Sequence, residues 1–529
     1  MSVLPLVSKR PVRRDWYRRI IGILILGVVL GFVLYHGGSE LQRYRVVSFN
    51  PPETDTSYVD PSSSPALNFS LESSHSVSTA DPTTTSSPPK PTTVDNNHVT
   101  YAILPPLDQE EIETTRESHL GRIDEVIAGE IENFRNWNVK QLEALKKYWL
   151  EVENAQPKVV LSTYGYVPCA MTVCSTTGEV IWLESLINSF RENNQFLLYT
   201  EYENLGKMYK KYGDVVTHVW STDNHVIWCF NDTISCIQST ENPDGIPPWK
   251  LFTFTFWGSP RGWQNFLAPP EPWSFNPLGG EWNLVPYRMP DQHFYLGYHY
   301  TGCQDLPFIP HSERKDQVLI LAKRSEYFHR WTFLEPSVWP VIKNKTGYNL
   351  ISVSNSEEGY PVPEALTLIG PMERHAYDVL LGSAKALLGI GRPRVSPSPF
   401  ASLCRGVPVI LPYKGTKCPA QPGDSTWCGD HQHGPAADIG PPYVYTVNSE
   451  GPIDDIVETI MTAVNTPIEP YTPPDMTKEA LTQRIQDYFS VDWKAYSEQK
   501  MRSSDWSGFK TQTFLYRWLE KYPVMPQKP

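Results

Sequence analysis

A glycine-rich segment in the last third of the chain has the residue types of a nucleotide-binding loop. It reads GIGRPRVSPSPFASLCRGVPVIL over residues 389–411, which predicts a strand end, a turn, a short helix and a second strand. Backbone N–H groups of such a turn and the positive end of the following helix bind phosphates. The segment has no carboxylate that could bind a ribose. The candidate nucleotide-binding residues here are Gly389, Gly391, Arg392, Arg394 and Ser398.

Metal-independent chemistry is expected at this loop. An Asp-x-Asp motif that could hold a divalent metal beside a diphosphate is absent from the sequence. The charge of a leaving diphosphate then has to be stabilised by helix N-termini and basic side chains. Lys323, the last residue of the predicted strand segment VLILAK, joins Arg392 and Arg394 as a candidate. The alternative, equally compatible with the pattern, is that all three are surface charges at strand ends.

A candidate general base lies at the start of a predicted helix. Residues 176–190, TTGEVIWLESLINSF, predict a helix with a threonine cap, one apolar face and Glu179 in its first turn. A carboxylate in that place can accept the proton of a hydroxyl nucleophile. The simpler interpretation of the pattern alone is an acid that complements the helix dipole.

Both candidate sites are set in alternating strands and helices, which predict parallel sheets covered on both faces. One alternation runs through KVVLS, QFLLYT and DVVTHVW, and a second runs through VLILAK, YNLISVS, ALLGIG, VPVILPY and YVYTV. Ligands of such folds bind outside the carboxyl ends of the strands. We therefore expect Lys323 and the 389–399 loop to share a crevice. Residues 230–310, rich in Trp, Pro and Gly, are expected to form irregular surface.

The N-terminal part of the chain predicts a membrane anchor. Residues 20–35 are sixteen uncharged, mostly apolar positions, and six Lys or Arg residues precede them. The positive-inside rule then leaves residues 1–19 in the cytoplasm and places the rest across the membrane. A cleaved signal peptide is the alternative. Residues 36–115, dense in Ser, Thr and Pro, predict a disordered stem, and residues 116–156 predict one amphipathic helix.

Composition and cysteine content are typical of a secretory protein. Lys and Arg total 46 against 58 Asp and Glu, and this net charge of −12 gives no support for a nucleic-acid partner. All eight cysteines follow the predicted anchor, where disulfides can form; pairing stays open, with Cys418–Cys428 the most plausible local loop. Three sequons, at Asn68, Asn231 and Asn344, are candidate glycosylation sites.

Four blocks of the sequence, in order, resemble one enzyme family. GEVIWLESLINS, NLVPYRMPDQHFYLGYHY, LIGPMERHAYDVLLGSAKALLGIGRPRVSPSPFASLCRGVPVILP and PPYVYTVNSEGPIDDIVETIMTAVNTPIEPYTPPDMTKEALTQRI look like glycosyltransferase family 18, the α-1,6-mannosyl-glycoprotein 6-β-N-acetylglucosaminyltransferases. The resemblance spans roughly residues 157–490. It implies a GT-B architecture of two facing Rossmann-like domains. It also implies Glu179 as the catalytic base.

The resemblance is incomplete in the donor loop. Where the family carries one glutamate before Pro-x-Pro and a second in the following helix that grips the ribose, this chain has Val395 and Ala401. A family lysine after the next strand has no secure counterpart, and Lys414 and Lys417 are only neighbours. Ala401 is therefore a candidate donor-binding position, but an alanine there cannot form the hydrogen bond to the ribose that the resemblance implies.

These observations predict a type II Golgi membrane protein with its head in the lumen. The expected function is inverting, metal-independent transfer of GlcNAc from UDP-GlcNAc to a mannose 6-hydroxyl of a glycoprotein N-glycan. Two alternatives stay open: a non-catalytic glycan-binding or scaffold protein on the same fold, or a transferase for another donor or acceptor. The expected domains are a cytoplasmic tail (1–19), a transmembrane anchor (20–35), a stem (36–115), a stem helix (116–156), an acceptor-side domain (157–310), a donor domain (311–470) and a helical strap (471–529).

Overall fold

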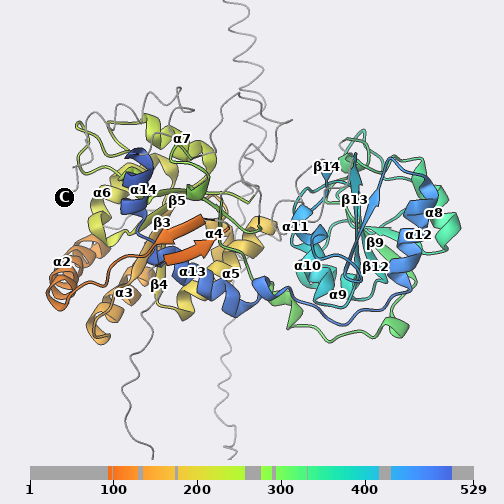
Figure 1. The fold of residues 1–529 in the computed structure, drawn as a ribbon, viewed down its shortest axis with the longest axis horizontal. Helices are drawn as coiled ribbons and strands as arrows, with labels where there is room; N and C mark the ends of the chain where they lie inside the picture. Colours follow the sequence, from red (N-terminus) through yellow and green to blue (C-terminus); the bar gives the residue numbers. More distant parts are fainter. Residues whose placement is uncertain are drawn as a thin grey trace, which may run out of the picture. The chain divides into compact units, whose positions relative to one another are not determined.

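The structure, a computed structural model, describes residues 93–97, 99–128, 135–172, 177–256, 276–288, 293–330, 332–415 and 430–502. All of them belong to one compact unit of the chain, Pro88–Pro529. Two separate sheets built mainly from parallel strands carry the fold, and Figure 1 shows the helices that flank each of them. The predicted α/β class with parallel sheets is therefore confirmed.

The first sheet has six strands, and all of its neighbouring strands are parallel, in the order β4-β3-β5-β6-β7-β8. The strand order reverses beside β3, so the switch point of this sheet lies between β3 and β5. The strands are β3 (Lys158–Ser162), β4 (Gln195–Tyr199), β5 (His218–Ser221), β6 (Leu251–Phe254), β7 (Asn283–Val285) and β8 (Phe294–Tyr295). The helices in this part are α4 (Val167–Thr172), α5 (Gly178–Glu192), α6 (Leu205–Tyr212) and α7 (Asp223–Asn231).

The expectation of irregular surface over residues 230–310 is wrong for three of its segments. Strands β6, β7 and β8 extend the first sheet, and every residue in them is buried. They are only two to four residues long and are separated by Pro- and Gly-containing connections, so an alternation pattern does not reveal them.

The second sheet has seven strands in the order β11-β10-β9-β12-β13-β14, with β15 paired in parallel to β13. Only β14 is antiparallel to its neighbour. The strands are β9 (Gln317–Leu321), β10 (Asn349–Ser352), β11 (Thr367–Leu368), β12 (Ala386–Gly389), β13 (Val409–Lys414), β14 (Asp430–His431) and β15 (Val444–Asn448). The helices are α8 (Val338–Thr346), α9 (Arg374–Gly382), α10 (Ser398–Leu403), α11 (Gly434–Ala437) and α12 (Ile453–Val464).

The switch point of the second sheet lies between β9 and β12. The strand order there reverses as in a doubly wound fold, which opens a crevice outside the carboxyl ends of these two strands. All residues of β9 and β12 are buried, because helices cover both faces; in Figure 1, α8 and α12 lie on one face and α9 and α10 on the other. Lys323 follows β9, and the glycine-rich loop follows β12.

The predicted disordered stem is wrong from residue 93 onward. β1 (Thr93–Asn96) and β2 (Val99–Ala102) form an antiparallel pair, and α2 spans Gln109–Ala128. The side chain of Asn96 donates to the Tyr295 carbonyl at 3.1 Å and accepts from the Tyr295 N–H at 2.9 Å. Tyr101 is fully buried against Phe294 and Trp493. These contacts with the first sheet fix a segment whose composition alone indicates disorder.

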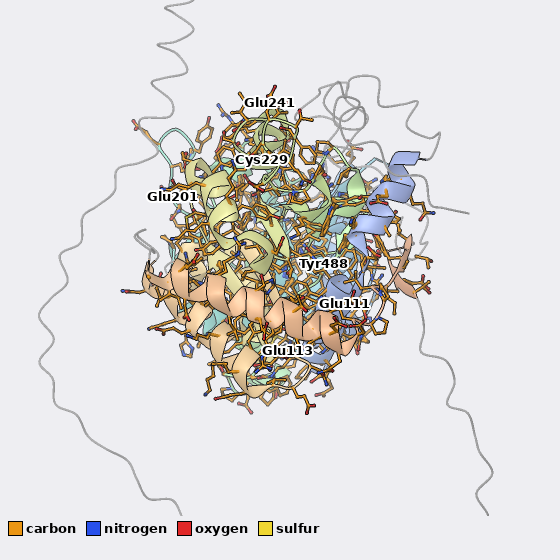
Figure 2. The ribbon with its side chains drawn as sticks, turned by 90° about the vertical axis from the view of Figure 1, so that its left-hand side faces the viewer. Glu111, Glu113, Glu201, Cys229, Glu241 and Tyr488 are labelled. Carbon is orange, nitrogen blue, oxygen red and sulfur yellow. A yellow bond between two sulfur atoms is a disulfide. The ribbon has the colours of Figure 1, made fainter. Side chains whose placement is uncertain are left out.

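The predicted single stem helix is two helices, α2 and α3 (Arg135–Glu151). Figure 2 shows α2 crossing one face of the molecule with Glu111 and Glu113 on it. On α3, the Asn138 side chain donates to the Tyr199 carbonyl at 2.8 Å and accepts from its N–H at 3.0 Å. Helix α3 therefore occupies hydrogen-bonding groups on the open edge of β4, which protects the sheet from edge pairing.

The C-terminal segment contacts helix α10 beside the second sheet and then packs on the first sheet. Tyr471 N–H donates to the Leu403 carbonyl of α10 at 2.9 Å, while α13 (Lys478–Ser490) and α14 (Trp493–Arg502) pack on the first sheet. There Tyr488, labelled in Figure 2, accepts a 2.9 Å hydrogen bond from the Trp220 indole of β5. The chain thus returns to its first sheet after completing the second.

Two disulfides lie in the described part of the chain, Cys229–Cys236 and Cys303–Cys404, and Cys169 is also disulfide-bonded. None of the helices in the described ranges is long and apolar enough to cross a membrane. The predicted anchor at 20–35, the stem as far as residue 92, the sequon at Asn68 and the proposed Cys418–Cys428 loop lie outside the described residues. They stay predictions.

Candidate functional site

A cavity of about 320 Å³ lies where the carboxyl ends of the second sheet face the start of α5. This volume is in the range of small-molecule binding sites. Glu179, Lys323, Ser398 and Ala401, all predicted from the sequence as site residues, are among the residues that line it. The apolar part of its wall includes Ile181, Phe256, Tyr327, Val353, Met372 and Val395.

Gly178, the first residue of α5, allows the two sides of the cavity to approach closely. A Cβ atom at this position would lie 2.6 Å from the Phe256 ring and 3.0 Å from Cδ of Pro397, both of which also line the cavity. Real Cβ atoms do not come that close to another carbon, so a side chain here would push the 395–398 loop away from α5. The close packing of α5 against this loop therefore requires glycine at position 178.

Glu179 lies in the first turn of α5 and is partly exposed. Within the described ranges its carboxylate makes no hydrogen bond or ion pair. Burial raises the pKa of the Tyr164 and Tyr287 hydroxyls well above the usual range, and the negative charge of Glu179 adds to both shifts. Thr177 occupies the N-cap as predicted, but its side chain makes no capping hydrogen bond. A carboxylate with unoccupied oxygens thus faces the cavity beside the helix N-terminus.

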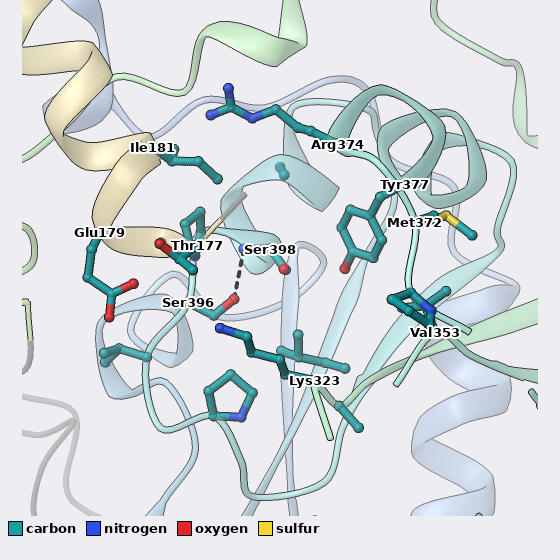
Figure 3. A pocket seen from close by; sticks show the side chains of 18 of the residues that line it. Thr177, Glu179, Ile181, Lys323, Val353, Met372, Arg374, Tyr377, Ser396 and Ser398 are labelled. Carbon is teal, nitrogen blue, oxygen red and sulfur yellow. Dashed lines mark hydrogen bonds between the residues drawn. The ribbon is translucent and has the colours of Figure 1, made fainter. Parts of the chain in front are cut away.

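Two cations from the second sheet line the cavity, and only one of them is paired. Arg374, at the start of α9, donates to Glu184 of α5 at 2.6 Å in a mostly buried ion pair that joins the two sides. Lys323 is exposed, and its ammonium has no hydrogen-bond or ion-pair partner in the part of the chain that the structure describes. In the view of Figure 3, Glu179 and Tyr377 lie on opposite sides of the cavity with Lys323 between them.

The short helix α10 brings hydroxyl groups but no acid to the cavity. Ser398 N–H donates to Ser396 Oγ at 3.1 Å, drawn as a dashed line in Figure 3. Burial raises the pKa of the Tyr377 hydroxyl to about 12, although its hydrogen bond to Ser398 opposes that shift. Val395 and Ala401 are both 1% exposed and present apolar surface. Of the described residues that line the cavity, only Glu179 carries a carboxylate.

Four of the predicted donor-binding residues do not line the cavity: Gly389, Gly391, Arg392 and Arg394. A Cβ at Gly389 would lie 2.1 Å from Oε1 of Gln432, and Gly391 has a φ of +102° that favours glycine. Arg394 donates to the His431 carbonyl at 3.1 Å. The structure therefore gives the two glycines and Arg394 a role in shaping the loop, and the predicted phosphate contacts of Arg392 and Arg394 stay a prediction.

Two buried residues that the sequence did not reveal hold this loop in place. Gln432 accepts from Gly391 N–H at 2.7 Å and donates to the Pro393 carbonyl at 3.1 Å. His433 donates through its backbone to the Arg394 carbonyl at 2.7 Å and through Nε2 to the Ser396 carbonyl at 2.5 Å. Burial lowers the pKa of His433 to about 4, which keeps the imidazole neutral. Their only sequence signal is a polar triplet, HQH, at residues 431–433.

Comparison with known proteins supports part of the predicted resemblance. No protein-family model matches the chain. Over 227 residues it is 26% identical to alpha-1,6-mannosylglycoprotein 6-beta-N-acetylglucosaminyltransferase A of Homo sapiens, covering 39% of this chain and 29% of that protein. The proteins of the same name from Cricetulus griseus and Mus musculus match with the same identity and coverage. The chain therefore matches less than a third of the length of these relatives.

Solved structures of low identity also align with the chain. UDP-GlcNAc 2-epimerase of Methanocaldococcus jannaschii, in complex with UDP-GlcNAc and UDP, is 11% identical with a TM-score of 0.34, covering 63% of this chain and 100% of that chain. A mutant O-GlcNAc transferase of Thermobaculum terrenum is 10% identical with a TM-score of 0.33, covering 75% and 78%. At these TM-scores the alignments carry no argument about function.

Proposed function

We propose that this protein is an inverting glycosyltransferase that takes GlcNAc from UDP-GlcNAc and transfers it to a mannose 6-hydroxyl of an N-glycan, without a metal. The observation that carries the proposal is that Glu179 and Lys323 line one cavity, and that neither the carboxylate nor the ammonium has a hydrogen-bond or ion-pair partner among the described residues. The sequence similarity to an N-acetylglucosaminyltransferase supports the reaction class.

In this proposal the second sheet holds the donor. The Lys323 ammonium stabilises the diphosphate, whose charge grows as the sugar leaves. The apolar wall around Val353 and Met372 contacts the uracil. Hydroxyls of Ser398 and Tyr377 bind the ribose, because no carboxylate is available at Val395 or Ala401.

Glu179 acts on the acceptor. As the acceptor oxygen bonds to C1 of the donor sugar, the bond between C1 and the phosphate oxygen breaks, and UDP departs with its electron pair. The hydroxyl proton passes to the Glu179 carboxylate. Attack opposite the leaving group inverts the configuration at C1. The close contact at Gly178 supports this geometry, since it brings the start of α5 against the 395–398 loop.

The proposal includes a setting in the Golgi membrane, with residues 20–35 as a single type II anchor and the head in the lumen. Its support is the sequence pattern: basic residues before an apolar run, then a Ser, Thr and Pro-rich segment. The sequons at Asn231 and Asn344, which are exposed on α7 and α8, are proposed glycosylation sites.

A non-catalytic glycan-binding protein is the second candidate. The specific observation in its favour is the lack of a carboxylate on the α10 side of the cavity, where Ala401 is buried. Such a protein would bind glycans but neither UDP nor a UDP-sugar.

The deciding experiment compares the full chain with its Glu179→Gln variant. Transfer to a neutral N-glycan is measured with a panel of UDP-sugars in excess chelator, and UDP binding is measured by calorimetry. We expect metal-free transfer that falls about 10²- to 10⁴-fold in the variant, while UDP affinity is retained. Glu192→Gln, an exposed change at the other end of α5, is the matched control. Equal rates for wild type and Glu179→Gln would remove Glu179 as the base, and absent UDP binding would favour the second candidate.

A further inference from the structure

We infer that three aromatic residues, Tyr202, His225 and Trp228, form a subsite for a neutral oligosaccharide, which binds the acceptor glycan beyond the sugar that reacts. We call these residues the aromatic cluster. The role as an acceptor subsite rests on the proposed function, whereas oligosaccharide binding by the cluster can be tested separately.

The rings of the aromatic cluster support one another. Tyr202 and His225 are stacked, with centroids 4.5 Å apart and planes at 22°. The Trp228 ring lies 5.5 Å from each of them, at 62° to Tyr202 and 41° to His225. His225 and Trp228 are three residues apart on α7, so they share one face of the helix. The result is a packed group of rings rather than one loose side chain.

Hydrogen bonds tie the aromatic cluster to the end of the first sheet. Thr163, directly after β3, bonds through Oγ1 to Ser221 Oγ of β5 at 2.7 Å and to His225 Nδ1 at 3.1 Å. Tyr202 follows β4. The cluster therefore lies at the carboxyl ends of β3, β4 and β5, which include the switch point of this sheet, where ligands of parallel α/β folds bind.

Trp228 presents an open surface. It is 52% exposed, whereas every other tryptophan in the described ranges is buried or half-buried. An indole costs free energy when it stays in water, and a rigid aromatic face that is open on one side packs well against the apolar face of a pyranose. Figure 2 labels Glu201 and Cys229, which are the sequence neighbours of Tyr202 and Trp228.

The charges around the cluster select a neutral ligand. Burial lowers the pKa of His225, and the nearby carboxylates of Glu203 and Asp223 oppose that shift. Burial raises the pKa of Tyr202 to about 12, and the charges of Asp232 and Glu203 add to the shift. The Glu203 carboxylate has no hydrogen-bond or ion-pair partner among the described residues. Such carboxylates accept hydrogen bonds from sugar hydroxyls and repel phosphates and acidic sugars.

The cluster and Glu179 can serve one extended ligand. Burial raises the pKa of the Tyr164 hydroxyl, and the charges of both Glu179 and Asp223 add to the shift, so both carboxylates lie near this hydroxyl. Trp228 is five residues beyond Asp223 on α7, about 7.5 Å along the helix axis. A ligand that reaches both Glu179 and Trp228 is therefore an oligosaccharide rather than a single sugar.

The experiment has to exclude another occupant, the chain's own glycan. Asn231 of the predicted sequon lies three residues after Trp228 on α7, and a glycan there could cover the indole. The full chain is therefore prepared in wild-type form and with Asn231→Gln. Trp228→Ala is made in both backgrounds, and Leu150→Ala, an exposed apolar change on α3, is the control.

Binding is measured by saturation-transfer NMR with a neutral biantennary N-glycan, and transfer is measured with this glycan and with a simple mannoside. We expect Trp228→Ala to weaken glycan binding about tenfold in both backgrounds, without changing UDP affinity or transfer to the mannoside. If Trp228→Ala leaves glycan binding unchanged in the Asn231→Gln background, the inference is overturned. It is also overturned if acrylamide quenches the fluorescence of Trp228 only after Asn231→Gln, because the chain's own glycan then covers the indole. Glycan binding that depends on Trp228 in a chain that transfers no sugar would support the subsite and reject the proposed function.

Discussion

Replacing Gln432 by methionine tests whether the loop between β12 and α10 owes its shape to one buried side chain. Gln432 is fully buried, and its amide bonds both the Gly391 N–H and the Pro393 carbonyl. Methionine has a similar length and no branch at Cβ, so the change removes the two hydrogen bonds with little change in volume.

The expected cost follows from the surroundings of the two loop groups. Gly391 is buried, so its N–H stays without a partner, at about 1–3 kcal/mol. Pro393 is partly exposed, so its carbonyl can bind water, and the loss there is about 1 kcal/mol. The sum is about 2–4 kcal/mol. If the loop loosens in the free protein, UDP binding has to order it again, and each 1.4 kcal/mol of that cost lowers the affinity about tenfold.

The assay is calorimetric titration of UDP into the full chain with excess chelator, together with thermal unfolding. We expect Gln432→Met to lower UDP affinity at least tenfold and to lower the unfolding midpoint. Gln483→Met is the control, because it removes a hydrogen bond to Asp487 on the exposed side of α13. Wild-type affinity and an unchanged midpoint in Gln432→Met would show that the loop keeps its shape without this side chain, and would refute the reasoning.

Three further predictions concern the same region. Gly178→Val puts a side chain against Phe256 and Pro397, so we expect transfer to fall at least tenfold with about 1–3 kcal/mol of lost stability, measured by rates and urea unfolding. His433 has a folded pKa of about 4, below its unfolded value of 6.5, so the unfolded state binds the extra proton and stability falls as the pH drops from 6.5 to 4, by up to about 3 kcal/mol. His433→Asn should flatten that part of the pH profile, and an unchanged slope would contradict the assignment. Ala401→Glu restores a carboxylate toward the ribose and should strengthen UDP binding by about 1.5–3 kcal/mol at most; calorimetry showing equal or weaker binding would mean that the ribose is held elsewhere.

The parts of the fold that could be predicted are those with long local patterns. β3 covers KVVLS and β9 overlaps VLILAK because buried parallel strands are continuous apolar runs. Helix α5 covers the predicted segment because its apolar face is a local pattern. The hairpin at 93–102 was not predicted because Asn96 and Tyr101 are held by contacts with Tyr295 and Phe294, about 200 positions further along the chain. No window of sequence contains such contacts.

The candidate site divides in the same way. Residue type and position in the sequence pattern singled out Glu179, at the start of α5, and Lys323, after β9. The fold brings both residues to one cavity. The glycines and arginines of the loop have types that suit a phosphate, yet contacts made by Gln432 and by the His431 carbonyl account for Gly391 and Arg394. These partners lie about 40 residues further along the chain, beyond a segment of unusual length, so spacing could not reveal them.

One small contact region ties the proposed base to the proposed donor site. Helix α5 carries Gly178, which meets Pro397 of the loop, and Glu184, which pairs with Arg374 of α9. Glu179 stands between these two contacts in sequence, so its carboxylate cannot shift far from the 395–398 loop while both persist. An inverting transfer needs the base and the anomeric carbon at a fixed separation, and effects of orientation are among the largest in catalysis. The chain thus has contacts that join the two sides, although Val395 and Ala401 place no acid in this part of the cavity. Of the two candidate functions, these contacts favour the proposed transfer reaction over glycan binding without catalysis.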